Sequence, residues 1–234
     1  MILGGLDLAW GEKNPDGVCL LEGHPDQIRC RFLGLVHGDD QITQLFAGVS
    51  PATGVLLAID APVICPNREG SRPVDRLTHQ LFHAEHAGAH PSNQTRCARP
   101  LRVVERLKAE NFTVGVEAPW HRRQIIETFP HPCTLRWFDR DIIFKYKKGP
   151  VEQQRIEFAA LQRSLRSLLR SRLPRLADQV EIIALLNQPW SKPVEDQTDA
   201  LMCALLAYDH WYAQGKMTEV LGDLNTGFMV IPKS

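Results

Sequence analysis

The first 60 residues alternate between short apolar runs and turn-rich polar segments, a pattern that predicts β-strands. Strands are expected at residues 2–10, 18–22, 28–36 and 54–60. The connections at 11–17 and 23–26 are short, so the first three strands should form an antiparallel meander. A helix capped by Asp39 or Asp40 and ending near Val49 is expected before the fourth strand. That strand is continuously apolar until Asp60, as in a strand covered on both faces.

Beyond residue 60 the spacing of apolar positions favours helices. Helices are expected at 74–87, 101–111, 151–173 and 198–214, strands at 121–129 and 182–186, and an edge strand or hairpin at 222–232. Three antiparallel strands followed by mixed helices and strands predict an α/β sheet with a parallel half. This order resembles that of ribonuclease H-like domains, with helices on both faces of a mixed sheet. We therefore expect one domain over 1–234, with a helical insertion rich in Arg and His at about 61–122 after the fourth strand.

Composition narrows the function classes. The chain has 234 residues, 44% hydrophobic and 23% charged, which is ordinary for a soluble globular protein. Its six cysteines include no C-x-x-C pair, which argues against a zinc ribbon or a dithiol redox motif. No secretory leader and no apolar stretch of roughly 20 residues is visible, so we expect a cytoplasmic protein without a membrane partner. A G-x-G-x-x-G motif is absent after the first strand, which disfavours a dinucleotide-binding sheet.

Four aspartates are the main candidates for chemistry. Asp7 interrupts the first apolar run, Asp60 ends the fourth, and Asp196 and Asp199 lie three residues apart near the start of the last helix. A carboxylate inside a core strand is costly unless it is paired or bound to metal. Simpler explanations exist for three of them: Asp60 could begin a turn, and Asp196 and Asp199 could cap a helix and favour its dipole. Asp7 has no such explanation.

Acids from separate elements that converge at strand ends are suited to Mg²⁺ or Mn²⁺, which prefer hard oxygen ligands. Two such ions about 4 Å apart can activate water and stabilise the leaving oxygen in phosphodiester hydrolysis. The aspartates therefore indicate a metal site with that chemistry.

Eight short motifs together resemble the domain-of-unknown-function family 429, whose members are described as predicted ribonuclease H-like nucleases. They are, in chain order, Gly5-Leu-Asp-Leu-Ala-Trp10, Ala58-Ile-Asp-Ala-Pro62, Arg72 with Asp75 and Arg76, Pro91-Ser-Asn93, Glu127-Thr-Phe-Pro130, Tyr146-Lys147 followed by Arg155, Asp196-Gln-Thr-Asp-Ala200, and Gly227 with Ile231-Pro232.

The resemblance implies a ribonuclease H-like fold and a metal-dependent nuclease, with nucleic acid as partner. By motif position it assigns metal binding to Asp7, Asp60 and Asp199, with Asp196 or Glu127 in support. We therefore predict catalytic roles for Asp7, Asp60, Asp199 and Glu127, and metal ligation by Asp7, Asp60, Asp196 and Asp199. Substrate-binding roles are predicted for Arg72, Arg76, Asn93, Tyr146, Lys147 and Arg155.

Histidines and basic residues form a second group. His79, His83, His86 and His90 are spaced 4, 3 and 4 residues apart and would form one stripe on a helix. They could bind zinc with a further ligand, line a substrate cleft and contact phosphate, or form an exposed face. The segment from Arg140 to Arg175 holds ten Lys or Arg residues against three Asp or Glu, and its lysines could grip phosphates.

Three functions are consistent with these features. The leading one is a metal-dependent nuclease that hydrolyses DNA or RNA. An alternative is a non-catalytic ribonuclease H-like domain that binds nucleic acid or protein, since fold does not fix function. A phosphotransferase of the sugar-kinase and actin type is a third, but it needs a duplicated domain and a second phosphate loop, and the sequence shows neither.

Overall fold

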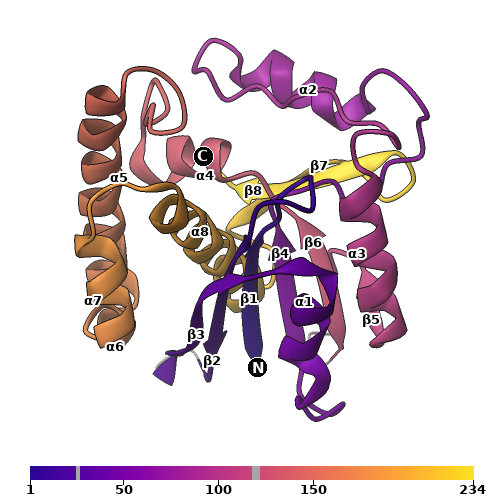
Figure 1. The fold of residues 1–234 in the computed structure, drawn as a ribbon, viewed down its shortest axis with the longest axis horizontal. Coiled ribbons are helices and arrows are strands. Elements are labelled where there is room, and N and C mark those ends of the chain that lie inside the picture. The colour runs from indigo at the N-terminus through magenta and orange to yellow at the C-terminus, as the bar shows by residue number, and fades with distance from the viewer. Residues whose placement is uncertain (25–26, 118–121) are drawn as a thin grey trace.

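A six-stranded mixed sheet forms the centre of the computed structural model, which describes residues 1–24, 27–117 and 122–234. The strand order is β3-β2-β1-β4-β6-β5 (Figure 1). The strands are β1 (Ile2–Asp7), β2 (Asp16–Glu22), β3 (Arg29–Val36), β4 (Val55–Ile59), β5 (Phe112–Val114) and β6 (Arg123–Glu127). The first three are antiparallel, whereas β4 runs parallel to β1 and β6 runs parallel to both β4 and β5. This is the predicted mixed sheet, and it is consistent with a ribonuclease H-like fold.

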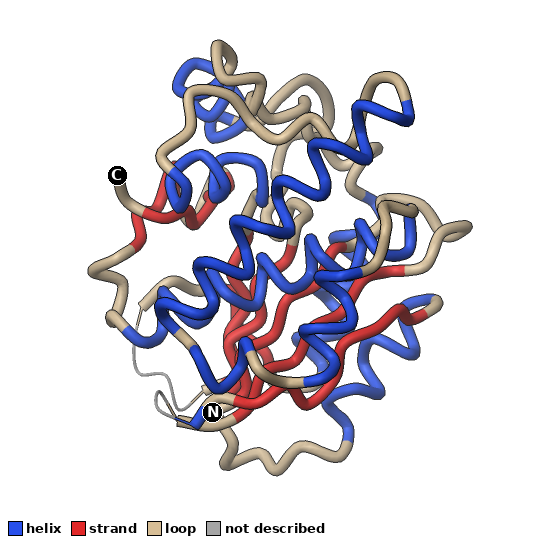
Figure 2. Tube along the Cα trace, turned by 90° about the vertical axis from the view of Figure 1, so that its left-hand side faces the viewer, coloured by secondary structure: helices blue, strands red, loops and turns tan. Residues whose placement is uncertain are grey.

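Helices cover both faces of the sheet (Figure 2). They are α1 (Gly38–Ala47), α2 (Pro73–Phe82), α3 (Ala98–Ala109), α4 (Pro130–Phe138), α5 (Val151–Arg172), α6 (Pro174–Ala177), α7 (Val180–Asn187) and α8 (Lys192–Tyr212). A separate antiparallel hairpin, β7 (Thr218–Asp223) with β8 (Gly227–Pro232), completes the fold. A parallel bridge between Thr128 and Val230 joins this hairpin to the end of β6.

Two glycines allow α8 to lie directly on the first hairpin of the sheet. A Cβ atom at Gly5 would lie 1.9 Å from the backbone oxygen of Ala200, and one at Gly17 would lie 2.1 Å from that of Asp196. Any larger residue would push the helix away, because both contacts are with backbone. This close approach brings the first half of α8, with Asp199, beside the end of β1.

Several element predictions were wrong in ways that have physical reasons. Residues 182–186 were expected to form a strand but belong to α7, whose buried Ile182, Leu185 and Leu186 have helical spacing. A short apolar run does not distinguish the two structures. The last helix begins at Lys192 rather than Thr198, with Ser191 at its N-cap, so Asp196 lies in its second turn and is not a cap.

Other helices and strands begin or end at different residues than predicted. The first strand ends at Asp7 rather than at residue 10, and α1 is preceded by His37 rather than capped by Asp39 or Asp40. Helix α2 ends at Phe82, and the strand expected at 121–129 is Arg123–Glu127, with His121 outside the described residues. Helices α4 and α6 and strand β5 were not predicted. The hairpin expected near the C-terminus is confirmed.

The segment 61–122 contains α2, α3 and β5, and β5 is an edge strand of the main sheet. Part of the expected insertion therefore completes the sheet itself. Across the described residues, every helix is too short or too polar to cross a membrane.

Candidate metal centre

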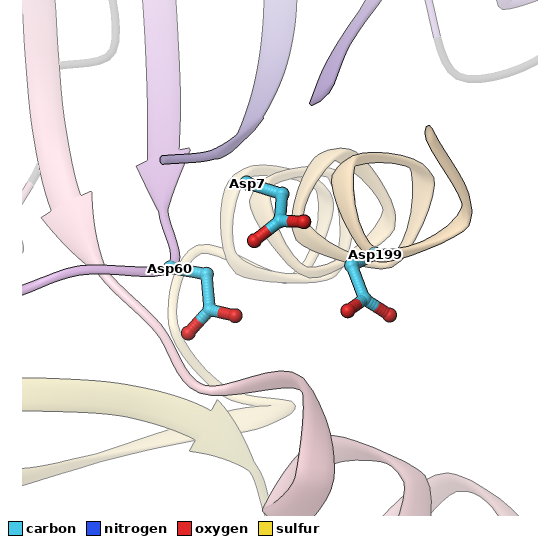
Figure 3. A group of neighbouring side chains, drawn as sticks. All are labelled: Asp7, Asp60 and Asp199. Carbon is cyan, nitrogen blue, oxygen red and sulfur yellow. The ribbon is translucent and has the colours of Figure 1, made fainter. Parts of the chain in front are cut away.

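Asp7, Asp60 and Asp199 meet at one edge of the sheet (Figure 3). Asp7 is the last residue of β1 and Asp60 directly follows β4. These strands are parallel neighbours with Leu6 opposite Ile59, so their carboxyl ends lie side by side. The backbone N–H of Asp60 donates to the carbonyl of Leu6 at 2.9 Å, which continues the pairing beyond the strand. Asp199 reaches the same point from α8.

The three carboxylates have the spacing of ligands to a common ion. Each offers an oxygen atom, and these atoms all lie within 4.8 Å of one another. Asp199 is fully buried, while Asp7 and Asp60 are half-buried. Oδ2 of Asp199 is inaccessible to solvent and accepts no well-oriented hydrogen bond from the described residues. Three hard oxygen donors at this spacing fit a divalent cation of the Mg²⁺ or Mn²⁺ type.

Tyr146 and Lys147 support this group from the loop between α4 and α5. The buried hydroxyl of Tyr146 donates to Oδ1 of Asp199 at 2.7 Å. Nζ of Lys147 lies 2.5 Å from Oδ2 of the same carboxylate. Both were predicted to bind substrate. The structure places them against Asp199, where Tyr146 fixes the orientation of the carboxylate and Lys147 offsets its charge.

Burial and crowded negative charge raise the proton affinity of Asp7 and Asp60. Burial raises the pKa of Asp7 well above its ordinary value, and the carboxylates of Asp199, Asp60 and Asp196 raise it further, against the opposing charge of Lys147. The pKa of Asp60 rises to about 7, again chiefly through burial. One ammonium group therefore does not compensate three carboxylates, and a bound cation would restore the balance.

The same imbalance acts on Lys147. Burial alone would lower the pKa of its ammonium group, but Asp199, Tyr146, Asp60 and Asp7 outweigh burial, and the pKa of Lys147 is raised well above its usual range. Lys147 is therefore a fixed positive charge beside the triad at physiological pH.

Glu127, a predicted catalytic residue, is held by an arginine instead of joining the triad. Nη2 of Arg72 lies 2.6 Å from Oε1 of Glu127, and Nη1 lies 2.8 Å from Oε2. The backbone N–H of Val63 donates to Oε2 as well, at 2.9 Å. Arg72 also pairs with Asp75 at 2.8 Å, and all three side chains of this cluster are buried. Arg72 is therefore fully engaged inside the protein and has no free face for a substrate.

The Arg72 cluster connects three segments near the triad. Arg72 precedes α2, Glu127 ends β6, and Nη1 of Arg72 also donates to the carbonyl of Ile64, at 2.9 Å, in the segment after Asp60. Glu127 is close enough to Asp60 to raise the pKa of that carboxyl. The cluster thus lies beside the metal centre and braces the chain that follows Asp60.

The remaining predicted site residues are engaged locally. Asp196 is buried and pairs with Lys192 at 2.7 Å. Arg76 is exposed and donates to the carbonyl of Ser71. Asn93 and Arg155 also contact nearby protein groups. The amide of Asn93 donates to the carbonyl of Gly70 at 3.2 Å, and Arg155 lies 4.0 Å from Glu152 on α5.

The four histidines do not form a helical stripe, because α2 ends at Phe82 and His86 has a positive φ of 65°. They nevertheless gather around one cavity, of about 520 Å³, together with His131 and three lysines. Within the described parts of the chain, the aspartate triad is the group of three or more ligating side chains close enough to share an ion. The zinc site that the histidine spacing allowed is therefore not formed there.

A buried arginine network behind Asp7 was missed by the sequence reasoning. Arg99 of α3 pairs with Asp16 at 2.6 Å and with Asp39 at 3.0 Å. It also donates to the carbonyls of Ala9 and Gly11, just after Asp7. The network fixes the segment between β1 and β2. No local pattern marks it, because its partners are 60 to 90 residues apart in sequence.

Comparison with known proteins identifies the family of this chain. No curated protein matches the chain. The model of a family described as "Protein of unknown function (DUF429)" matches residues 5–226, which include all three triad aspartates and both of their supporting residues. The chain therefore belongs to the DUF429 family.

Proposed function

We propose that this protein is a metal-dependent hydrolase that cleaves phosphodiester bonds of nucleic acid. The observation that carries the proposal is the convergence of Asp7, Asp60 and Asp199, with ligand oxygens within 4.8 Å of one another, at the carboxyl edge of a mixed sheet. Buried acids without matching cations are costly to fold, so an arrangement of this kind is best explained by a bound cation.

Asp7, Asp60 and Asp199 would hold Mg²⁺ or Mn²⁺. When bound, such an ion polarises a phosphoryl oxygen and lowers the pKa of coordinated water. The chain's own contribution is to fix the three carboxylates before the ion arrives. Tyr146 holds Oδ1 of Asp199 by a hydrogen bond and Lys147 contacts Oδ2, so the orientation of that carboxylate is fixed. Backbone pairing of β1 with β4 holds Asp7 and Asp60 in register.

Lys147 supplies positive charge on the substrate side of the triad. Its Nζ contacts Asp199, and the same side chain lines the cavity that contains the histidines. A phosphate that enters from this cavity meets the ammonium group before the carboxylates. An ammonium group positioned there offsets the repulsion between substrate phosphate and aspartates, and stabilises charge that develops on the phosphoryl oxygens.

The reaction is hydrolysis without a covalent enzyme intermediate. The oxygen of a water forms a bond to phosphorus, and the bond between phosphorus and the leaving oxygen breaks. One proton of the water ends on the leaving oxygen, and the other stays with the new phosphomonoester or passes to solvent. Arg72, Asp75 and Glu127 act as positioning residues, since they touch neither the triad oxygens nor the cavity's lysines directly and brace the segment after Asp60.

The direct test combines metal binding with cleavage. Calorimetric titration with Mn²⁺ should give a binding isotherm for the native chain, and none for Asp7→Asn or Asp199→Asn. Labelled single-stranded DNA, duplex DNA and RNA should be cleaved with Mg²⁺ or Mn²⁺, and not with EDTA. Asp178→Asn, which changes an exposed aspartate outside the site, is the matched control and should behave like the native chain.

Cleavage that survives in Asp7→Asn would contradict the proposal and point to a contaminant or another site. Nucleic-acid binding that needs no metal and is unchanged in the aspartate variants, with no cleavage of any substrate, would favour a non-catalytic binding domain.

A further inference from the structure

The cavity beside Lys147 is built from three separate segments. One wall is the end of α2 and the loop after it, with His79, His83, His86 and His90. The second contains Phe129 and His131 at the start of α4, and the third is the loop 143–148. The backbone N–H of Ile143 donates to the carbonyl of Glu85 at 3.1 Å, which joins the first wall to the third. A backbone hydrogen bond between segments far apart in sequence therefore holds two walls of the cavity together.

The charge of the cavity is uniformly basic or neutral. Its lining residues include Lys145, Lys147 and Lys148 in addition to the histidines, and none of its described lining residues is acidic. Lys145 and Lys148 are exposed and form no ion pair with a described carboxylate, so their ammonium groups are available to a ligand. A concave surface with several cations and no carboxylate attracts a phosphate-bearing ligand.

His131 contributes an imidazole ring to the cavity wall. Nδ1 of His131 is inaccessible to solvent and has no hydrogen-bond partner among the described residues. Burial and the neighbouring charges of Lys147, Lys148 and His90 lower the pKa of this imidazole well below its usual value. His131 is therefore a neutral ring that lines the cavity without adding to its positive charge.

The cavity also has flat and apolar walls. Phe129 and Ile143 line it, and the rings of His79 and His83 stack on each other with centroids 5.4 Å apart. Its volume of about 520 Å³ lies within the range of about 300–1,000 Å³ that is typical for small-ligand pockets. Phosphate alone would need neither the rings nor this space, whereas a base can stack on aromatic or imidazole rings.

We propose that this cavity binds the single nucleotide next to the cleaved phosphodiester, with its phosphate at Lys145 and Lys148 and its base among the rings of His79, His83 and Phe129. The proposal rests on the proposed function, because Lys147 is the side chain shared by the cavity and the metal centre. The triad binds the metal but does not recognise the substrate, and this cavity would supply that recognition.

The test measures binding of small ligands to the full chain in EDTA, so that the result does not depend on the metal centre. Nucleoside monophosphates, ribose 5-phosphate and inorganic phosphate are titrated calorimetrically. A nucleoside monophosphate should bind at least about tenfold more tightly than inorganic phosphate, since stacking of one base adds this much. The double variant Lys145→Ala with Lys148→Ala should weaken nucleotide binding by about tenfold or more, as expected for lost charged hydrogen bonds.

Matched controls separate the subsite from general effects. Lys108→Ala removes an exposed lysine of α3, and His37→Ala removes an exposed histidine before α1. Both should bind nucleotides as the native chain does, whereas His83→Ala should lose affinity for nucleoside monophosphates and keep its affinity for inorganic phosphate.

The outcomes distinguish the two proposals. Equal affinity for phosphate and nucleotide, or affinity unchanged in both the lysine and the His83 variants, would overturn the nucleotide subsite even if Mn²⁺ binding and cleavage are observed. Nucleotide binding that follows the predicted variants, without Mn²⁺ binding at the triad, would support the subsite and overturn the proposed hydrolysis.

Discussion

Two clusters of buried carboxylates lie side by side in this protein and differ in how their charge is balanced. In the first, Arg72 holds Asp75 and Glu127, and every carboxylate oxygen accepts a hydrogen bond from Arg72 or a backbone N–H. In the second, the three aspartates of the triad face one lysine, and Oδ2 of Asp199 accepts no well-oriented hydrogen bond from the described residues.

The difference distinguishes a structural cluster from a binding site. A buried acid that is satisfied inside the protein contributes to one fixed arrangement, because its hydrogen bonds compensate for lost hydration. Burial is the largest cause that raises the pKa of Asp7, Asp60 and Glu127 alike, and neighbouring acids raise the pKa of Asp7 and Asp60 further. Glu127 and the triad are all acids at strand ends or on a helix, but the Arg72 cluster has one cation for two carboxylates, whereas the triad has one for three.

Removal of Arg72 should have the largest effect on stability. The substitution Arg72→Ala leaves Glu127 and Asp75 buried without their partner, which should reduce the free energy of unfolding by about 3–5 kcal/mol. Urea unfolding of the metal-free chain measures this loss. Arg76→Ala, four residues along, removes an exposed arginine and should change stability by less than about 0.5 kcal/mol. Equal losses in the two variants would contradict the assignment of Arg72 as a structural residue.

Tyr146→Phe tests the triad, the second of the two clusters. It removes the hydroxyl that orients Asp199 and keeps the ring, which packs against Phe158 with centroids 5.8 Å apart. Loss of an oriented partner of a ligand reduces metal affinity by about 10–100-fold. Mn²⁺ titration gives the affinity, and thermal unfolding in EDTA shows whether the fold is kept. An unchanged Mn²⁺ affinity would exclude a positioning role for Tyr146.

Asp7→Asn should stabilise the metal-free chain while it abolishes metal binding. The substitution removes one of three repelling carboxylates and keeps the size of the side chain. The gain should be on the order of 1 kcal/mol, since solvent partly screens charges at a half-buried site. Urea unfolding with EDTA and with Mn²⁺ separates the two effects: Mn²⁺ should stabilise the native chain and leave the variant unchanged. Destabilisation of the variant in EDTA would mean that Asp7 is a structural acid like Glu127.

The pH dependence should be the smallest and most gradual effect. The folded chain keeps the proton of Asp60 up to a pKa of about 7, whereas the unfolded chain releases it near the ordinary value of 3.8. This carboxyl therefore favours the folded state at low pH, and its contribution is lost as pH rises from about 4 to 7. Mn²⁺ must displace that proton, so its affinity should rise by about fivefold from pH 6 to 7 and by about twofold more from pH 7 to 8.

Calorimetric titrations at pH 6, 7 and 8 measure this dependence. Lys216→Ala, which changes a remote exposed lysine, should follow the native profile. A flat profile for the native chain would show that Asp60 does not take part in metal binding.

Local sequence patterns are enough to predict the sheet and the main acids. Alternating apolar runs and short turns specify the first hairpins because side chains in a strand alternate between faces. Asp7 and Asp60 stand out because each breaks or ends an apolar run, and parallel neighbours bring such ends together. Gly5 and Gly17 are equally local features, and their lack of a Cβ lets α8 approach the sheet closely.

Which acids act together, and what the basic residues contact, depends on contacts that form when the chain packs. Glu127 and Asp60 both end parallel strands, yet one is bound by an arginine 55 residues away and the other is not. The histidines do not form a helical stripe, because α2 ends at Phe82. Instead they line one cavity together with Lys145 and Lys148. Pairings of this kind depend on side-chain contacts between distant segments, and these exist only once the chain has packed. A local pattern indicates which acids are costly to bury. Whether a cationic side chain compensates their charge depends on which distant segments pack against them in the folded protein.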